Sequence, residues 1–272
     1  MARLGASSFA FPDFNGVTRR LVLVNLAAYF VLELARRVAR PGLADWLSKA
    51  FAFTPHLFLQ GALWQPFTYS FIHVGLLGTL FELLSLWFLA GFLENFHSSS
   101  WVTGLYAVSV LGTAVAATAI YSLSGVFHYS VGEIPIYGCV GGVFGLLVAI
   151  GTLYGDMQFL LFFTIGIKAR YLVAIYALIS IAMLFGQQRM YAFAQLGGAL
   201  AGLFYVRLAP RRGVTFAFSE RWYAFRNGYY RWKRRRAARK FEVYMRRQGR
   251  TVRFDGQGRK IDEDADDKKR WN

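Results

Sequence analysis

The chain has 272 residues, of which 56% are hydrophobic and 18% aromatic, and its formal net charge is +16. This composition is too apolar for an ordinary soluble domain of that length. A single cysteine excludes an intrachain disulfide framework and a multi-cysteine metal cluster. We therefore expect an all-α, polytopic membrane protein.

The hydrophobic stretches predict a bundle of six transmembrane helices, because about 20 apolar residues are enough to cross a bilayer core. Residues 1–16 lack the apolar core of a secretory signal, so we expect the first span to be retained. Lys168 and Arg170 separate the fifth span from the apolar run 157–167, which we place at the membrane interface. The predicted spans are Arg20–Ala39, Phe71–Leu93, Trp101–Ser122, Ile136–Tyr154, Tyr171–Phe185 and Met190–Leu208.

Basic residues predict the orientation, because short loops rich in Lys and Arg tend to stay cytoplasmic. Residues 209–272 hold 20 Lys and Arg against 8 Asp and Glu, which is +12 of the total charge. Arg19 and Arg20 precede span one, and Lys168 and Arg170 precede span five. With six spans, both termini are expected in the cytoplasm. The exceptions after span one are Arg36, Arg37, Arg40 and Lys49.

The second span carries a small and polar stripe, in which Gly75, Gly78, Glu82 and Ser85 share one helical face. Small residues let membrane helices approach closely, so we assign Gly75 and Gly78 to helix packing. A carboxylate in the middle of an apolar span is costly unless it faces the bundle interior and is hydrogen-bonded. Gln195 on the sixth span is a predicted partner for Glu82, and a client helix is the alternative.

The fourth and sixth spans carry matching glycines, which predict close contact between these two helices. Val140 and Gln195 are expected near their crossing. The glycines assigned to packing here are Gly142, Gly145, Gly198 and Gly202.

Taken in order, the stretches Trp64–Glu94, Tyr137–Ala149 and Ala194–Val206 resemble the rhomboid family of intramembrane serine proteases. The resemblance implies a serine in G-x-S-G at the start of the fourth span, where this chain has Val140. It also implies a histidine that opens the stripe of the sixth span, where this chain has Gln195. Gly78 and Glu82 replace a histidine and an asparagine that help to bind the oxyanion in the family. The positions kept in register are His73, Trp87, Gly91 and Glu94.

Hydrolysis by such a site needs a nucleophile and a base, and valine and glutamine supply neither. On a helix, Cys139 would point about 100° away from position 140, so we do not assign it as a substitute nucleophile. His128 and Ser130 are expected to be ordinary loop residues. The four histidines lack a ligand spacing, so we expect no metal and no cofactor.

We therefore expect a pseudoprotease rather than an enzyme. By resemblance to inactive relatives, it would bind transmembrane segments of client proteins, in a bacterial inner membrane or a plasma membrane. Glu82, Gln195, Gly138 and Gly141 are the predicted client-binding residues. An active intramembrane serine protease and a lipid-organising structural protein remain the alternatives. The oligomeric state is not predicted.

The chain is expected to divide into a segment 1–17, a membrane domain 18–208 and a basic tail 209–272. Within the tail, 219–249 is predicted to form an amphipathic helix, which Ser219 caps and Gly249 ends. Such a helix suits an anionic lipid surface better than nucleic acid, which is the alternative partner. Residues 255–272 are expected to be disordered. The predicted lipid-facing residues are Trp222, Trp232, Lys233, Arg234, Arg235 and Arg236.

Overall fold

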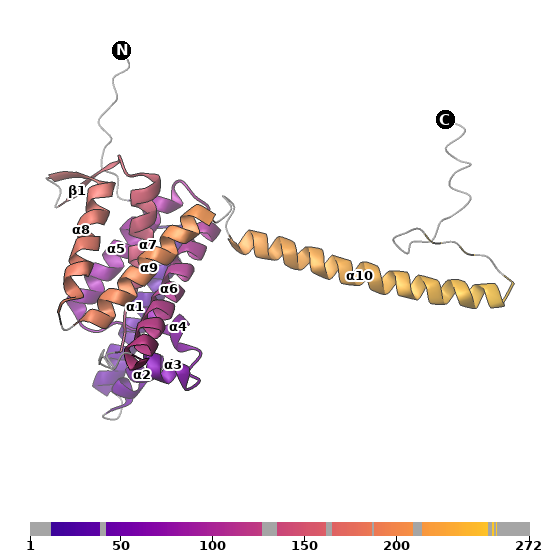
Figure 1. Ribbon diagram of the computed structural model, residues 1–272, viewed down its shortest axis with the longest axis horizontal. Helices are drawn as coiled ribbons and strands as arrows, with labels where there is room; N and C mark the ends of the chain where they lie inside the picture. The colour runs from indigo at the N-terminus through magenta and orange to yellow at the C-terminus, as the bar shows by residue number, and fades with distance from the viewer. Residues whose placement is uncertain are drawn as a thin grey trace, which may run out of the picture. The chain divides into compact units, whose positions relative to one another are not determined.

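The computed structural model describes residues 12–38, 42–126, 135–161, 165–186, 188–208 and 214–249, together with 252 and 254. The described part is mainly helical, as the composition predicts (Figure 1). The chain divides into two compact units, Met1–Thr215 and Phe216–Asn272.

Each predicted span overlaps one helix, although the ends differ by up to five residues. The helices are α1 (Gly16–Val38), α5 (Leu76–Glu94), α6 (Ser99–Val126), α7 (Val140–Leu153), α8 (Ala169–Met183) and α9 (Arg189–Leu208). In the described part of the chain, two segments are long and apolar enough to cross a membrane, namely Leu76–Glu94 and Ser99–Ser124. The helices α7 and α8 are apolar but shorter. The count of six crossings therefore stays a prediction.

Short elements connect these helices. Between α1 and α5 lie α2 (Leu43–Phe51), α3 (Pro55–Leu59), α4 (Gln65–Thr68) and the 3-10 turn η1 (Tyr69–Phe71). Between α7 and α8, strands β1 (Gln158–Leu161) and β2 (Ile165–Lys168) pair antiparallel, with Gln158 opposite Lys168. This hairpin departs from the all-α prediction, because a run rich in Phe and Ile suits a strand as well as an apolar interface segment.

Helices α6, α7 and α9 form the tightly packed centre of unit 1 (Figure 1). A Cβ atom at Gly198 would lie 2.7 Å from the carbonyl oxygen of Gly141. A Cβ atom at Gly202 would lie 2.7 Å from Cα of Gly145. Only glycine allows the backbones of α7 and α9 to approach this closely. Gly142 and Gly145 face α6 in the same way, against Tyr106 and Ser109.

The structure corrects the packing role expected for Gly75 and Gly78. Among the described residues, no atom lies within 4 Å of a Cβ atom built at either position. Gly75 precedes α5 with φ of 81°, a left-handed conformation that favours glycine, so it belongs to the turn and not to the helical face. Gly78 lies on the exposed side of α5. A small residue that faces outward gives the same sequence pattern as one in a helix contact.

At one end of unit 1, the starts of α1 and α6 lie beside the ends of α5 and α9. The Glu94 carboxylate at the end of α5 accepts hydrogen bonds from the backbone N–H groups of Val17 and Thr18 in α1, at 2.8 and 3.0 Å. The Tyr205 hydroxyl near the end of α9 donates to the Trp101 carbonyl at the start of α6, at 3.1 Å. The helices therefore run alternately up and down.

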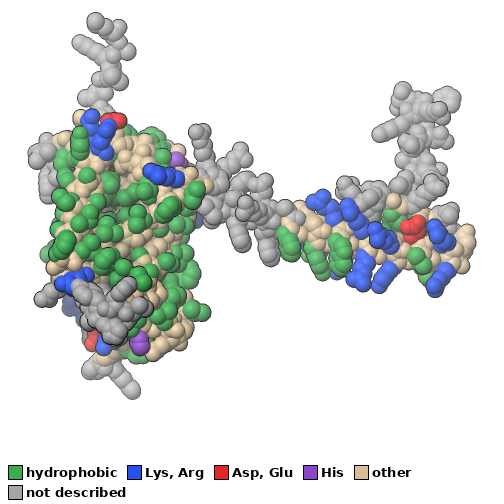
Figure 2. Space-filling model, viewed as in Figure 1, with side chains coloured by type: hydrophobic (Ala, Val, Ile, Leu, Met, Phe, Trp, Pro, Cys, Tyr) green, Lys and Arg blue, Asp and Glu red, His purple; other side chains and the backbone are tan. Residues whose placement is uncertain are grey.

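The surface of unit 1 is apolar around its middle. On the face drawn in Figure 2, hydrophobic side chains cover the central belt, and Lys and Arg gather toward the two ends. Large side chains such as Leu77, Phe81, Leu178 and Leu200 are more than half exposed. An apolar belt between charged ends is the surface expected of a protein embedded in a bilayer.

Unit 2 is dominated by α10 (Val214–Arg247). The helix begins before the predicted start, so Ser219 lies inside it and is not its cap. Gly249 follows the end with φ of 72°, as expected for a glycine that stops a helix. The predicted amphipathic division is weak, because adjacent aromatics such as Tyr229 and Tyr230 face different sides. Trp232 and Lys233–Arg236 are exposed, and the side chain of Trp222 lies outside the described residues.

Candidate functional site

The rhomboid serine and histidine positions lie on two central helices. Val140 is the first residue of α7, and Gln195 is a buried residue of α9. The Gln195 side-chain oxygen accepts a hydrogen bond from the hydroxyl of Ser180, at 3.1 Å, and Ser180 is fully buried on α8. This bond links α8 to α9. Ser180 is not predicted as a site residue, because a lone serine in an apolar span has no distinctive pattern.

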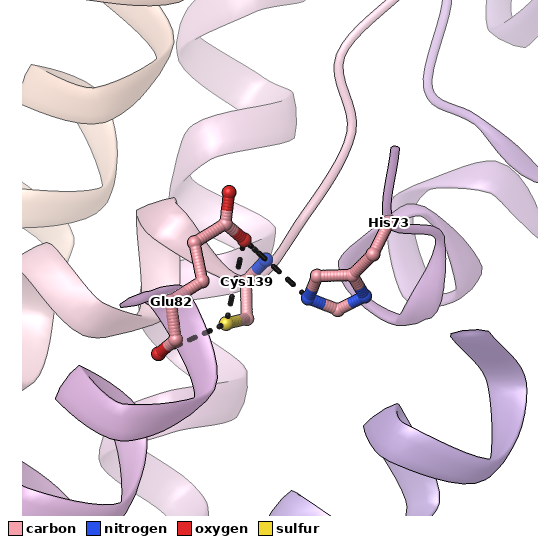
Figure 3. A group of neighbouring side chains, drawn as sticks. All are labelled: His73, Glu82 and Cys139. Atoms are coloured by element: carbon pink, nitrogen blue, oxygen red, sulfur yellow. Dashed lines mark hydrogen bonds and ion pairs between the residues drawn. The ribbon is translucent and has the colours of Figure 1, made fainter. Parts of the chain in front are cut away.

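Glu82 is the centre of a polar cluster at the start of α7 (Figure 3). Its Oε2 atom accepts a hydrogen bond from the backbone N–H of Cys139, at 3.1 Å, and lies 3.7 Å from the Cys139 sulfur. The Nε2 atom of His73 lies 3.4 Å from the same oxygen. The side chains come from three elements, since His73 precedes α5, Glu82 lies in α5 and Cys139 caps α7.

Gly138 makes room for this cluster. Its φ is +82°, a left-handed backbone conformation that favours glycine. A Cβ atom at Gly138 would collide with the Glu82 carboxylate. The backbone N–H of Gly138 donates to the carbonyl oxygen of Ile72, at 2.8 Å, which holds the loop before α7 against the segment that carries His73.

The predicted bond between Glu82 and Gln195 is wrong in this structure. The hydrogen bonds of Glu82 go to Cys139, and the bond described for Gln195 goes to Ser180. Tyr191, one turn before Gln195, lies within interaction range of both side chains. The prediction assumed that both side chains face the interior of the bundle. Gln195 does so, but a buried side chain can bond to any of several neighbours, so its burial does not identify its partner.

The orientation expected for Cys139 is also wrong, because this residue does not lie within a helix. It is the N-cap of α7, with φ of −88° and ψ of 10°, so the helical spacing used to orient it does not apply. Its side chain is fully buried and close to His73, a neighbour that the sequence did not predict. Because these residues are far apart along the chain, only the family register of His73 could have suggested the contact.

The order of these groups differs from that of a hydrolytic triad. In such a triad, one imidazole nitrogen faces the nucleophile and the other faces the acid. Here Nε2 of His73 faces Glu82, and Nδ1 lies 3.2 Å from the carbonyl oxygen of Phe71. Glu82, not the imidazole, lies next to the sulfur. The cluster can therefore hold a proton or a cation, but its geometry does not suit nucleophilic attack by Cys139.

Helices α5 and α8 flank this site. Both pack against α7, and among the described residues they have little contact with each other. Their outer faces are apolar, with Phe81 of α5 and Leu178 of α8 exposed by 65% and 67%. The positions His128 and Ser130, considered for a loop site, lie outside the described residues.

Comparisons with known proteins agree on a membrane family. A model of the family described as "Eukaryotic integral membrane protein (DUF1751)" matches residues 20–228. Rhomboid-like protein 19 of Arabidopsis thaliana is 26% identical over 211 residues, which are 75% of this chain and 64% of that protein. A Rhomboid protease GlpG homolog of Cronobacter sakazakii is 30% identical over 142 residues, which are 52% of this chain and 45% of that protein. The chain spans less than two thirds of either relative.

Proposed function

We propose a function on the premise that the chain belongs to the Eukaryotic integral membrane protein (DUF1751) family and to the rhomboid family. The protein is a rhomboid-like integral membrane pseudoprotease. It binds transmembrane segments of client proteins, as a scaffold or quality-control factor, and does not hydrolyse them.

The observation that carries this proposal is the pair Val140 and Gln195. Valine offers no attacking atom, and a glutamine amide does not accept a proton near neutral pH. The Ser180 hydroxyl already donates to the oxygen of Gln195, which supports a structural role for this side chain. The glycines of α7 and α9 still pack closely against each other around these two positions. The protein therefore keeps the helix packing of a protease site but lacks the reactive side chains.

The arrangement of α5 and α8 supports a lateral route for a client helix. Both helices rest on α7, and their apolar outer faces are exposed. A client helix that passes between them would first reach the partly exposed carboxylate of Glu82, and it would have to displace neighbouring groups to reach Gln195 and the backbone of Gly138 and Gly141, which are buried. Such groups could hydrogen-bond to polar residues that a lone client helix leaves unsatisfied in lipid.

The proposed membrane domain covers residues 18–208 and crosses the bilayer six times, with both termini in the cytoplasm. The start of α1 and the end of α9 lie at the same end of unit 1, which supports an even number of crossings. Arg19, Arg20 and Arg207 flank helix ends that meet at the end of unit 1 where Glu94 binds α1. Their charge agrees with a cytoplasmic end.

A fluorophosphonate probe distinguishes this proposal from an active serine protease. We expect the purified, folded chain to show no labelling above background, because position 140 lacks a hydroxyl group. An active serine hydrolase in the same detergent is the positive control. Stoichiometric labelling of any serine, or cleavage of a membrane-embedded peptide, would show that the protein is an enzyme.

Site-specific photocrosslinking tests client binding. A crosslinker at Phe81 or Leu178 is expected to capture transmembrane proteins, since both side chains are exposed beside the proposed route. The matched control is Val31 of α1, which is 63% exposed but lies on another helix. Capture of lipid alone at Phe81 and Leu178, or equal protein capture at Val31, would contradict client binding by this route.

Anionic lipid is the proposed second partner, through the exposed basic residues of α10. Replacement of Arg234, Arg235 and Arg236 by Glu in a tail fragment 209–272 should weaken binding to anionic vesicles by roughly 100-fold or more, at about 1 kcal/mol for each lost basic residue. The triple Lys variant, which keeps the charge, is the control in co-sedimentation. Equal binding to neutral vesicles, or a preference for RNA over anionic lipid, would exclude this role.

The second alternative, after an active serine protease, is a lipid-organising protein in which the tail is the active part. Deletion of residues 209–272 separates the two functions. If the protein is a pseudoprotease that binds clients, the shortened chain should keep its protein crosslinks at Phe81. If the tail is the active part, neither the full chain nor the shortened chain should capture a client protein at Phe81, and the shortened chain should no longer bind anionic lipid.

A further inference from the structure

The cluster of His73, Glu82 and Cys139 has the composition of a metal site. One ligand atom from each side chain lies within 4.8 Å of the others, and they come from three separate segments of unit 1 (Figure 3). We propose that these three residues bind one zinc-type divalent transition-metal ion. This proposal revises the expectation of no metal, and it does not depend on client binding.

Two of the three distances within the cluster fit tetrahedral coordination. Zinc binds nitrogen, oxygen and sulfur ligands at about 2.0 to 2.3 Å, so two ligands of one tetrahedral ion lie about 3.3 to 3.6 Å apart. Nε2 of His73 is 3.4 Å from Oε2 of Glu82, and the Cys139 sulfur is 3.7 Å from the same oxygen. The third pair, Nε2 of His73 and the Cys139 sulfur, lies within 4.8 Å, so these two atoms would move closer together to share one ion.

The second, independent observation is the buried nitrogen of His73. Nδ1 lies 3.2 Å from the Phe71 carbonyl oxygen, which can only accept, so Nδ1 carries the proton. The Nε2 atom is buried and has no hydrogen-bond partner among the described residues. In the neutral imidazole the Nε2 lone pair would face an oxygen of Glu82 at 3.4 Å, and a cation between the two atoms, a proton or a metal ion, turns this repulsion into attraction. Such a backbone bond to the far nitrogen is the usual support of a metal-binding histidine.

The ligand types select the class of metal. Mg²⁺ and Ca²⁺ prefer oxygen ligands alone, whereas a set of thiolate, imidazole and carboxylate suits zinc. On binding, the Cys139 thiol releases its proton to solvent. The thiolate and the carboxylate then balance the two positive charges of the ion, which leaves a neutral group in an apolar interior. Three protein ligands leave a fourth position for water or for a group from a bound molecule.

Metal analysis of the full chain tests the proposal. The protein is purified without a histidine tag, loaded with Zn²⁺, passed over a weak chelator and analysed by mass spectrometry of the metal. We expect one zinc per chain. In the Co²⁺-loaded protein we expect a thiolate-to-cobalt charge-transfer band, which reports on Cys139 because the chain has one cysteine.

Substitutions assign the site. Cys139→Ser should abolish the charge-transfer band, and Cys139→Ser and Glu82→Gln should each weaken zinc binding by more than roughly 10-fold, the smallest loss typical of residues that merely support a ligand. His56→Gln, a histidine outside the cluster, is the matched control and should keep one zinc. Stoichiometric zinc that survives both substitutions would place the ion elsewhere and overturn the proposal.

A measurement on the unsubstituted protein covers the case in which a variant does not fold. Zn²⁺ should raise the Tm of the wild-type chain in proportion to the logarithm of its free concentration, because only the folded state brings the three ligands together. Mg²⁺ at the same concentration should leave the Tm unchanged. A Tm unaffected by Zn²⁺, or a chain that retains less than half an equivalent of zinc after loading, would contradict the site.

Discussion

Replacement of Gly198 by alanine is expected to destabilise unit 1 by about 1 to 3 kcal/mol, the usual cost of an overpacked core. The added methyl group would lie 2.7 Å from the carbonyl oxygen of Gly141 and would also meet the Thr113 hydroxyl. A backbone oxygen at the head of α7 cannot move aside as the end of a flexible side chain can. Helices α7 and α9 would have to separate, and their remaining contacts would loosen.

Gly78→Ala is the matched control for this experiment, because Gly78 is also a helical glycine of unit 1. Nothing described lies within 4 Å of its added Cβ atom. Alanine favours a helix over glycine by about 1 kcal/mol, so this variant should be neutral or slightly more stable. Equilibrium unfolding in detergent measures both variants. Equal stability of the two would mean that α7 and α9 do not approach as closely as the structure has them.

These two glycines also show how far the sequence could predict the packing. The stripes of spans four and six were interpreted correctly as a close contact, because Gly198 and Gly202 face Gly141 and Gly145. The same reasoning placed Gly78 in a contact where the described residues supply none. Helical spacing identifies which residues share a face. Whether that face meets protein or lipid depends on the arrangement of the other helices, which the local pattern does not contain.

Of the cluster His73, Glu82 and Cys139, the sequence singles out only Glu82 as a site residue and predicts neither of its neighbours. The family register draws attention to Glu82, whose carboxylate accepts a hydrogen bond from Cys139 and lies beside His73. Two local features redirect it: the left-handed Gly138, and the start of α7 after Cys139. Spacing rules assume that a helix continues, and they fail at the residue where it begins. The contacts of the residues at the start of α7 are therefore visible only in the structure.

Glu94→Ala is expected to destabilise the protein by about 2 to 3 kcal/mol, because the carboxylate satisfies several donors at once. It accepts from the backbone N–H groups of Val17 and Thr18, and from the hydroxyls of Thr18 and Ser99. The first turn of α1 has no acidic residue of its own, so Glu94 supplies its cap from α5. Bonds to a charged acceptor contribute about 1.5 to 3 kcal/mol, and the abandoned donors add their desolvation cost.

The isosteric change Glu94→Gln separates charge from shape. The N–H groups of Val17 and Thr18 donate to different oxygens of the carboxylate, so the single oxygen of glutamine can accept from only one of them, and its amide hydrogens would face the donors of the other oxygen. We therefore expect a loss close to that of alanine. Glu33→Ala is the control, because Glu33 forms an exposed ion pair with Arg36, one turn along α1. Exposed pairs contribute about 0 to 1 kcal/mol, so this variant should unfold almost as the wild type does. If Glu33→Ala and Glu94→Ala cost the same, the cap on α1 would not hold the ends of α1 and α5 together.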